Sequence, residues 1–241
     1  MLQKTRALIL HSLKYGDSSL IIHAFTEKWG RSSFLLKGVR KSKKQNRANM
    51  FQPFFLLELD IYYKDNREFQ WIKEASFLGS LPMNDQDMVK SAQAIFLSEV
   101  LMKTVREEEK NPALFEFLVD SISFFNDHNF PLPSYHIVFL FQLSRFLGFY
   151  PKNNYSEERP YFRPESGAFS QMPGSAKVEQ EKLLGRQWKF CFNANYLNAD
   201  QEFSQQALRN LFLDSLLSYY DHHHPSLADL KSLDVLRTVF S

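Results

Sequence analysis

The chain has 241 residues, of which 44% are hydrophobic and 24 are phenylalanine, a composition typical of packed globular proteins and long enough for two domains. Its single cysteine, Cys191, excludes an intrachain disulfide and any cysteine-based zinc site. No apolar run approaches the ~18 residues of a membrane span, and a strand pattern rather than a signal sequence follows the N-terminal residues. We therefore expect a cytoplasmic protein with no membrane partner.

The overall charge of +2 conceals an uneven distribution. Residues 1–80 contain fourteen Lys and Arg against seven Asp and Glu, a net charge of +7, so residues 81–241 carry 2 − 7 = −5. A basic front half joined to a mildly acidic back half predicts that the front half meets an anionic partner.

Five short runs of strand-forming residues lie in the front half. They are residues 5–13, 20–25, 31–39, 54–63 and 69–77, with turn-forming residues at 16–17, 29–30 and 64–67 between them. Five short strands with one long charged connection predict a small antiparallel barrel. The five-stranded oligonucleotide-binding (OB) barrel is the leading candidate, because it holds single strands on one face and its loops.

The long connection, residues 37–47, is strongly basic. Six of its eleven residues are Lys or Arg, and residues 31–57 contain no Asp or Glu. Because such a run repels itself, it needs solvent or an anionic partner, and a basic loop on a β-scaffold suits a polyphosphate backbone. The alternative is a merely solvated loop.

Several aromatic residues lie near the predicted strand ends or turns, where a ring can stack on a base. They are Tyr15, Trp29, Phe34, Tyr62, Tyr63 and Trp71. About half of them should be barrel core, because small barrels fill themselves with side chains. Our candidates for base stacking are Tyr15, Phe34 and Tyr63.

The back half has helical patterns. Asn111 and Pro112 predict a helix start, and residues 134–147 are apolar almost all round, as expected for the central helix of a bundle capped by Gly148. Residues 150–187 read as an irregular excursion with a short hairpin, and the last helix should begin at Pro225, with Leu227, Leu230, Leu233 and Leu236. The predicted fold is therefore α+β, with an OB-type barrel in residues 1–80 and an α-helical domain in residues 81–241.

No motif requires catalysis. The eight glycines form no phosphate-binding loop, and no Gly-x-Ser-x-Gly elbow occurs. Adjacent helical residues point about 100° apart, so His222, His223 and His224 should not converge on one metal ion; we expect them to interact with a helix dipole instead. We predict a protein that is not an enzyme and has no metal and no cofactor.

A series of short motifs runs through the chain in a fixed order. It comprises Arg6-Ala7-Leu8-Ile9-Leu10-His11, Tyr15-Gly16-Asp17-Ser18-Ser19-Leu20, Phe25-Thr26-Glu27, Gly30-Arg31, Lys37-Gly38-Val39-Arg40, Gln52-Pro53-Phe54, Leu147-Gly148-Phe149-Tyr150-Pro151, Ser166-Gly167-Ala168-Phe169 and Lys231-Ser232-Leu233. This series resembles the RecO family of bacterial recombination mediators over its full length. The resemblance is specific because the motifs occur in the same order along the chain, and no single motif is diagnostic.

The resemblance implies a non-enzymatic, nucleoid-associated DNA repair protein with an N-terminal OB barrel and a helical domain. Such proteins bind single- and double-stranded DNA, anneal complementary strands, associate with RecR, grip the C-terminal tail of single-stranded-DNA-binding protein, and so help RecA to load. The basic loop lies where the family's barrel meets DNA, which implies a phosphate-neutralising role for Arg31, Lys37, Arg40, Lys41, Lys43, Lys44 and Arg47. Arg145 is our candidate for the cation that meets the tail's carboxylate.

The chain departs from the family pattern in one place. Many relatives carry a four-cysteine zinc motif after Leu-Gly-Phe-Tyr-Pro, whereas residues 150–187 contain no cysteine. We therefore predict no zinc and expect packing of Tyr161, Phe162 and Phe169 to hold this segment. The rival to the DNA hypothesis is a protein-interaction module whose basic loop docks an acidic partner; a third alternative is a nuclease.

Overall fold

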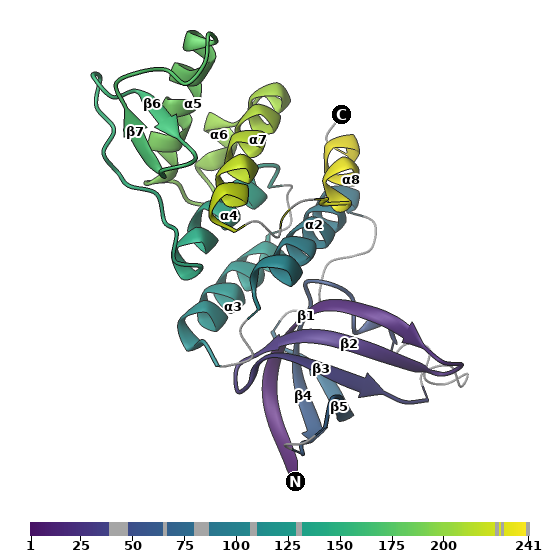
Figure 1. Ribbon diagram of the computed structural model, residues 1–241. Coiled ribbons are helices and arrows are strands. Elements are labelled where there is room, and N and C mark those ends of the chain that lie inside the picture. Colours follow the sequence, from purple (N-terminus) through teal and green to yellow (C-terminus); the bar gives the residue numbers. More distant parts are fainter. Residues whose placement is uncertain are drawn as a thin grey trace. The chain divides into compact units, whose positions relative to one another are not determined.

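The computed structural model describes residues 1–38, 48–64, 67–79, 87–106, 110–128, 132–224, 227 and 229–239. The chain divides into two compact units, Met1–Asn129 and Phe130–Ser241. Unit 1 contains a five-stranded barrel with two long helices, and unit 2 contains helices and a small hairpin (Figure 1). Among the described residues, every helix is too short or too polar to cross a lipid bilayer.

The front half forms the predicted barrel. Its strands are β1 (Leu2–Tyr15), β2 (Ser19–Thr26), β3 (Gly30–Leu36), β4 (Leu56–Tyr62) and β5 (Gln70–Phe77). They close in the order β1-β2-β3-β5-β4, because β1 pairs with both β2 and β4 and β3 pairs in parallel with β5. This is the OB-type topology. The alternation along each strand sends one set of apolar side chains inward and leaves the other set on the outer surface.

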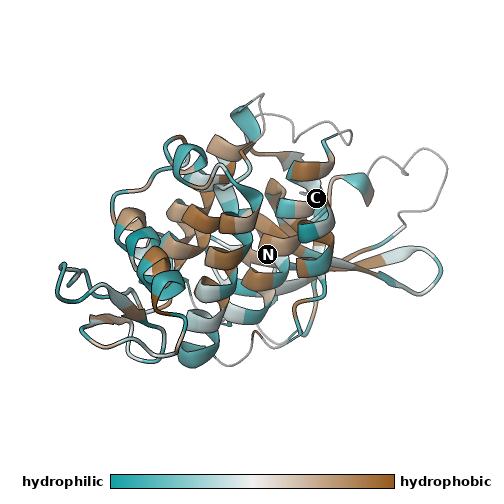
Figure 2. Cartoon of the chain, turned by 90° about the horizontal axis from the view of Figure 1, so that it is seen from above, coloured by the Kyte–Doolittle hydropathy of each residue, from teal (hydrophilic) through white to brown (hydrophobic). Residues whose placement is uncertain are grey.

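Glycines allow the tight turns at the ends of the hairpins. Gly16 and Gly30 have φ values of +58° and +60°, in the left-handed region that suits a residue without a Cβ atom. The β1–β2 hairpin extends from the barrel and ends in a hydrophilic turn (Figure 2).

Two helices lie against one end of the barrel, α2 (Met88–Thr104) and α3 (Pro112–Asp127) (Figure 1). The predicted start of α3 is confirmed, since the side-chain oxygen of Asn111 accepts a hydrogen bond of 3.1 Å from the backbone N–H of Leu114 and Pro112 is the first helical residue. The ring of Phe115 on α3 packs against that of Phe25 on β2, with 6.2 Å between centroids. Unit 1 therefore has an interface between barrel and helices that is partly aromatic.

Unit 2 is built around α4 (Tyr135–Phe146), which is buried almost all round as predicted and is followed by Gly148 with φ +84°. The other elements are β6 (Tyr161–Arg163), β7 (Ala168–Ser170), α5 (Val178–Cys191), α6 (Ala199–Glu202), α7 (Gln206–His223) and α8 (Ser232–Val239). The β6–β7 pair is the hairpin predicted in the irregular excursion.

Two predicted boundaries are wrong. The irregular stretch ends at Lys177, not near residue 187, because α5 exposes most of its surface and so shows only a thin apolar stripe. The last helix begins at Ser232, not at Pro225; residues 225 and 226 lie outside the described part of the chain. Leu227 is buried ahead of that helix, and Asp229 has φ +65°, which a continuous helix does not allow.

Aromatic packing holds the hairpin, as predicted: Tyr161, Phe162 and Phe169 are all buried. The ring of Phe162 stacks on Trp188 of α5 with 3.7 Å between centroids. Gly185 permits this approach, because a Cβ atom there would lie only 1.7 Å from the carbonyl oxygen of Pro160. The residues of this segment do not fit a cysteine-ligated zinc ion, since rings and not thiols converge here and the chain has one cysteine in all.

The remaining residues suspected of chemistry have structural roles. Cys191 is completely buried, and burial raises the pKa of its thiol well above the ordinary value. His222 pairs through Nδ1 with the carbonyl oxygen of Ser218, and His223 pairs through Nε2 with that of Pro164. In the described part of the chain, no group of three or more His, Cys, Asp and Glu could hold a metal ion.

Candidate nucleic-acid interface

The barrel presents a row of apolar and aromatic side chains on its outer surface. Strand register places these residues opposite one another across all five strands. In spatial order they are Leu13 on β1, Ile21 on β2, Leu35 on β3, Trp71 on β5 and Tyr62 on β4, called the outer row below. Leu13, Tyr62 and Trp71 are 44%, 46% and 39% exposed. A solvent-facing row of this kind offers flat and apolar surfaces to unpaired bases.

Two cations contact Trp71 of the outer row. The ammonium of Lys37 lies 4.0 Å from the centroid of a Trp71 ring, and the guanidinium carbon of Arg67 lies 4.5 Å from it. Both are within cation–π range. Lys37 follows β3 directly and is the first residue of the basic loop, so the loop begins beside the exposed tryptophan.

Of the seven predicted phosphate contacts, two lie in the described part of the chain, Lys37 and Arg31. The other five, Arg40, Lys41, Lys43, Lys44 and Arg47, lie outside the described residues, and their role stays a prediction. Lys37 is exposed, and its role as a phosphate contact stays a prediction.

The three candidates for base stacking have different environments. Tyr15 is 54% exposed at the end of β1, two residues beyond Leu13 of the outer row. Tyr63 lies beside the end of β4 with its ring stacked on Trp29, 4.7 Å between centroids and 10° between planes. Phe34 is fully buried in the barrel core, so its assignment as a stacking residue is corrected: the inward pleat of β3 leaves its ring no face for a base.

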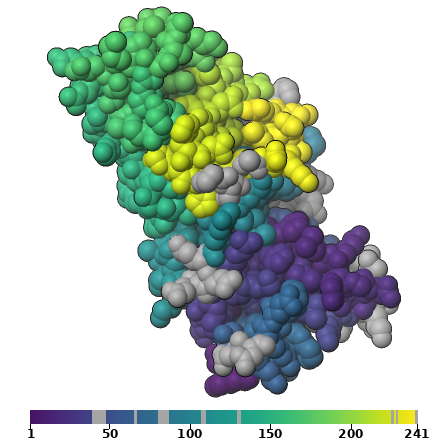
Figure 3. Space-filling view, viewed as in Figure 1, coloured from purple at the N-terminus to yellow at the C-terminus, as the bar shows by residue number. Residues whose placement is uncertain are grey.

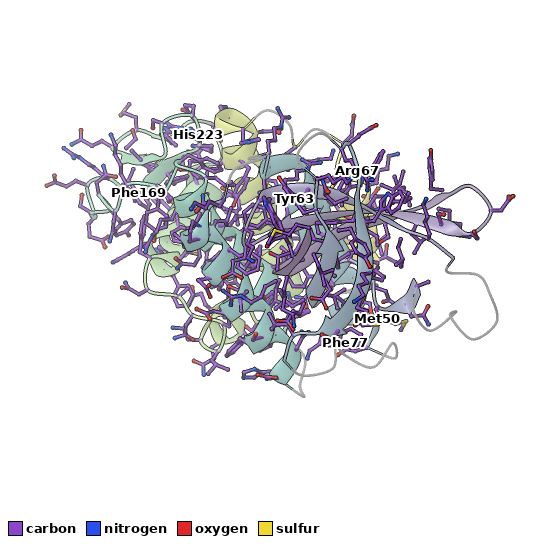
Figure 4. The ribbon with its side chains drawn as sticks, turned by 90° about the horizontal axis from the view of Figure 1, so that it is seen from below. Met50, Tyr63, Arg67, Phe77, Phe169 and His223 are labelled. Carbon is purple, nitrogen blue, oxygen red and sulfur yellow. The ribbon has the colours of Figure 1, made fainter. Side chains whose placement is uncertain are left out.

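Arg67 and Tyr63 also line a hollow of about 550 Å³ on the barrel, called the arginine hollow. His23, Trp29, Arg31, Ser33 and Gln70 are among its other lining residues. The side chains of Arg67 and Tyr63, both labelled in Figure 4, lie on the same side of the barrel. The amide of Gln70 fixes the turn between β4 and β5, since it accepts from the N–H of Lys64 at 2.9 Å and donates to the carbonyl of Lys64 at 2.8 Å.

His23 lies in the arginine hollow and contacts Ser33, with 2.9 Å between its Nδ1 and the serine Oγ. Burial lowers the pKa of His23, and the nearby charges of Arg31 and His11 lower it further. The imidazole is therefore neutral at pH 7. It can exchange hydrogen bonds with a base but adds no charge for phosphate binding.

Arg31 points toward the helices of unit 1. Its Nη1 donates to the carbonyl oxygens of Met102 at 2.9 Å and of Val105 at 3.3 Å, at the C-terminal end of α2. A cation there satisfies helix carbonyls that have no intrahelical partner and complements the helix dipole. These contacts give Arg31 a structural role that the sequence analysis did not foresee.

Changing Arg31 to Gln should therefore lower the free energy of unfolding by about 1–3 kcal/mol, because the carbonyl oxygens at the end of α2 lose a charged donor. The affinity for single-stranded DNA should change less than threefold. Urea denaturation and fluorescence anisotropy measure the two effects. A tenfold loss of DNA affinity at unchanged stability would instead show that Arg31 neutralises a phosphate.

Arg145, the candidate for partner-tail binding, is exposed on α4 in unit 2. Its guanidinium carbon lies 4.5 Å from the centroid of the Tyr150 ring. The charged group is thus held over an aromatic ring at the surface and is accessible to a carboxylate.

Trp71 and Arg67 were not among the site residues predicted from the sequence. The alternation Ile61-Tyr62 and Trp71-Ile72 did contain the relevant information, because the buried isoleucines put both aromatic neighbours on the outer face. The pairing of β3 with β5, which brings Lys37 to Trp71, is a long-range feature that no local pattern reveals. In the space-filling view, atoms of the barrel strands (purple to blue) form much of the surface of unit 1 on the side drawn (Figure 3).

An OB-type barrel with an exposed row of aromatic and basic side chains, ahead of a helical region, defines a two-part protein of the OB-fold class. Comparisons with known proteins are specific. The family model described as "Recombination protein O N terminal" matches residues 1–81, and that described as "Recombination protein O C terminal" matches residues 85–234. The chain belongs to the RecO family, so its role lies in DNA repair and recombination.

Similar proteins match along their whole length. The DNA repair protein RecO of Bacteroides fragilis is 35% identical over 242 residues, with all of both chains covered. That of Phocaeicola vulgatus is 33% identical over 251 residues, again with full coverage, and that of Flavobacterium psychrophilum is 31% identical over 240 residues, with 99% of each chain covered. The family resemblance seen in the order of the motifs is thereby confirmed.

Proposed function

We propose that this protein binds single- and double-stranded DNA through the outer row and the basic loop, and anneals complementary strands during repair. The observation that carries the proposal is the contact of the exposed Trp71 ring with both Lys37 and Arg67, at the point where the basic loop begins. A ring in contact with two cations brings an apolar surface for a base and positive charge for the adjoining phosphates to the same site.

The proposed mechanism is electrostatic and uses no cofactor and no catalytic residue. Two DNA strands repel each other through their phosphates. When one basic surface neutralises both backbones, this repulsion falls and the local concentration of the strands rises, so pairing becomes faster. The outer row keeps bases unpaired and accessible until they meet their complement.

The proposed partners besides DNA are proteins of the same repair process. Family membership supports association with RecR, capture of the C-terminal tail of single-stranded-DNA-binding protein, and hence loading of RecA onto DNA coated by that protein. Arg145 is proposed as the cation for the tail's carboxylate. The mildly acidic back half of the chain, residues 81–241, favours protein partners over DNA.

The experiment that tests DNA binding is fluorescence anisotropy of a labelled single-stranded oligonucleotide at several salt concentrations. If about six cations contact phosphates, the slope of log affinity against log salt should be about −4. Negligible binding at low salt would overturn the proposal. A slope flatter than about −2 would remove the basic loop as the main contact.

A further inference from the structure

A second, larger hollow lies on the barrel beside the arginine hollow. Its volume is about 990 Å³, and its lining includes Lys28, Trp29, Tyr63, Lys64, Lys110 and Glu116, all within unit 1. It is called the lysine hollow below. Its volume is at the upper end of the range for sites that bind small ligands, so it has room for a nucleotide.

The stacked pair of Trp29 and Tyr63 lines both hollows. Arg67 lines the arginine hollow and also flanks Trp71 of the outer row. Lys37 and Arg67 both contact Trp71, Arg67 lines the arginine hollow together with the aromatic pair, and that pair also lines the lysine hollow. A chain of alternating rings and cations matches the alternating bases and phosphates of a single strand.

The lysines of this hollow are available to a ligand. Lys28, Lys64 and Lys110 are exposed, and none forms an ion pair with a described residue. They come from three separate segments: the turn after β2, the end of β4 and the residue two places before α3. Three such cations facing one concave space give it a positive potential.

The acidic residues of the hollow are neutralised locally. Glu27 accepts two hydrogen bonds from the Arg6 guanidinium, at 2.8 and 2.9 Å, and Glu116 pairs with the same group. The hydrogen bonds from Arg6 hold the pKa of Glu27 below its ordinary value. Arg6 and the two glutamates together contribute one net negative charge, against three positive charges from the lysines, so the hollow favours an anion.

We propose that the lysine hollow holds an unpaired nucleotide of the DNA strand that leaves the outer row, with its phosphate on Lys28, Lys64 and Lys110 and its base against the Trp29–Tyr63 pair. This inference rests on the proposed function. It extends the interface from the basic loop across the barrel to a second cationic site, and it gives the strand a fixed end point there.

The test compares two variants of equal charge. One is Lys28→Gln/Lys64→Gln/Lys110→Gln, and the control is Lys152→Gln/Lys177→Gln/Arg186→Gln, which removes three exposed cations from unit 2. Labelled oligo(dT) of about twenty nucleotides is the probe. The first variant should have a salt slope flatter by about 2, from three lost contacts to a single strand, and an affinity at low salt at least tenfold weaker, whereas the control should match the wild type.

A second readout follows the aromatic pair itself. In the Trp71→Phe background, the remaining tryptophans are Trp29 and the fully buried Trp188, so quenching by oligo(dT) reports on Trp29. We expect oligo(dT) to quench the Trp29 fluorescence. Adding Lys28→Gln/Lys64→Gln/Lys110→Gln should abolish this quenching at the same oligonucleotide concentration. A melting temperature within 2 °C of the wild type would show that these exposed substitutions leave the fold intact.

The outcomes separate this inference from the proposed function. Wild-type binding with a slope unchanged in the lysine variant, or binding of oligo(dT) by the Trp71→Phe protein, measured by anisotropy, without Trp29 quenching, would overturn the lysine hollow alone and leave the basic loop as the DNA site. Absence of wild-type binding would overturn both.

Discussion

Changing Lys41, Lys43 and Lys44 together to Glu is expected to weaken single-stranded DNA binding roughly a hundredfold or more at low salt. The change removes three cations and adds three anions to a loop that has no acidic residue of its own. Each lost phosphate contact forfeits the release of a counterion, and each new carboxylate repels the backbone. Anisotropy with a labelled oligonucleotide measures the loss, and annealing of two complementary strands should fail in parallel.

The matched control is the variant Lys152→Glu/Lys177→Glu/Arg186→Glu, which carries the same change of net charge at exposed positions of unit 2. It should retain most of the affinity. Equal losses in both variants would mean that total charge, and not the basic loop, governs binding.

The same loop variant separates the DNA proposal from the rival protein-interaction module. If the loop binds DNA, the variant should lose annealing and keep its protein partners. If the loop docks an acidic partner, the variant should lose that partner and keep annealing. Incubation of DNA with the wild type and magnesium tests the nuclease alternative; we expect no cleavage.

The strands and most helices were predictable because their patterns are local. Alternation over β1 and the capping residues Asn111 and Pro112 each specify an element without reference to the rest of the chain. The predicted strand runs likewise coincide with β1 to β5 to within a few residues at each end. Local patterns failed for α5, because most of this helix is exposed and its apolar stripe is narrow. They also failed for the start of α8, because Leu227 has the spacing of a helical apolar residue, whereas the positive φ of Asp229 breaks the helix.

The site was less predictable, because burial and cross-strand partners decide it. Phe34 and Trp71 are both aromatic residues of predicted strands, yet one is fully buried and the other is 39% exposed. In the closed barrel the pleat of the strands places them on opposite faces, Phe34 in the core and Trp71 on the outer surface. Arg31 belongs to a basic stretch by sequence, but the fold directs it to the end of α2, a contact across about seventy positions of sequence.

Changing Trp188 to Ala should lower the free energy of unfolding by about 3–5 kcal/mol. Its indole is fully buried and contacts rings from two other elements: Phe162 of β6 at 3.7 Å, and Phe212 and Tyr219 of α7, each at 5.3 Å between centroids. Its Nε1 also donates to Ser215 at 3.0 Å. The substitution removes a large side chain that the surrounding rings cannot replace, and it leaves the β6–β7 hairpin without its main support.

Trp71→Ala is the control, because it removes the same side chain from an exposed site and should cost less than about 1 kcal/mol of stability. Urea denaturation of both variants gives the comparison. A chelator should leave the wild-type denaturation curve unchanged, since stacked rings and not a metal hold this hairpin. A Trp188→Ala loss no larger than that of Trp71→Ala, or a wild type that the chelator destabilises, would contradict the assignment of the Phe162–Trp188 stack as the main support of this hairpin.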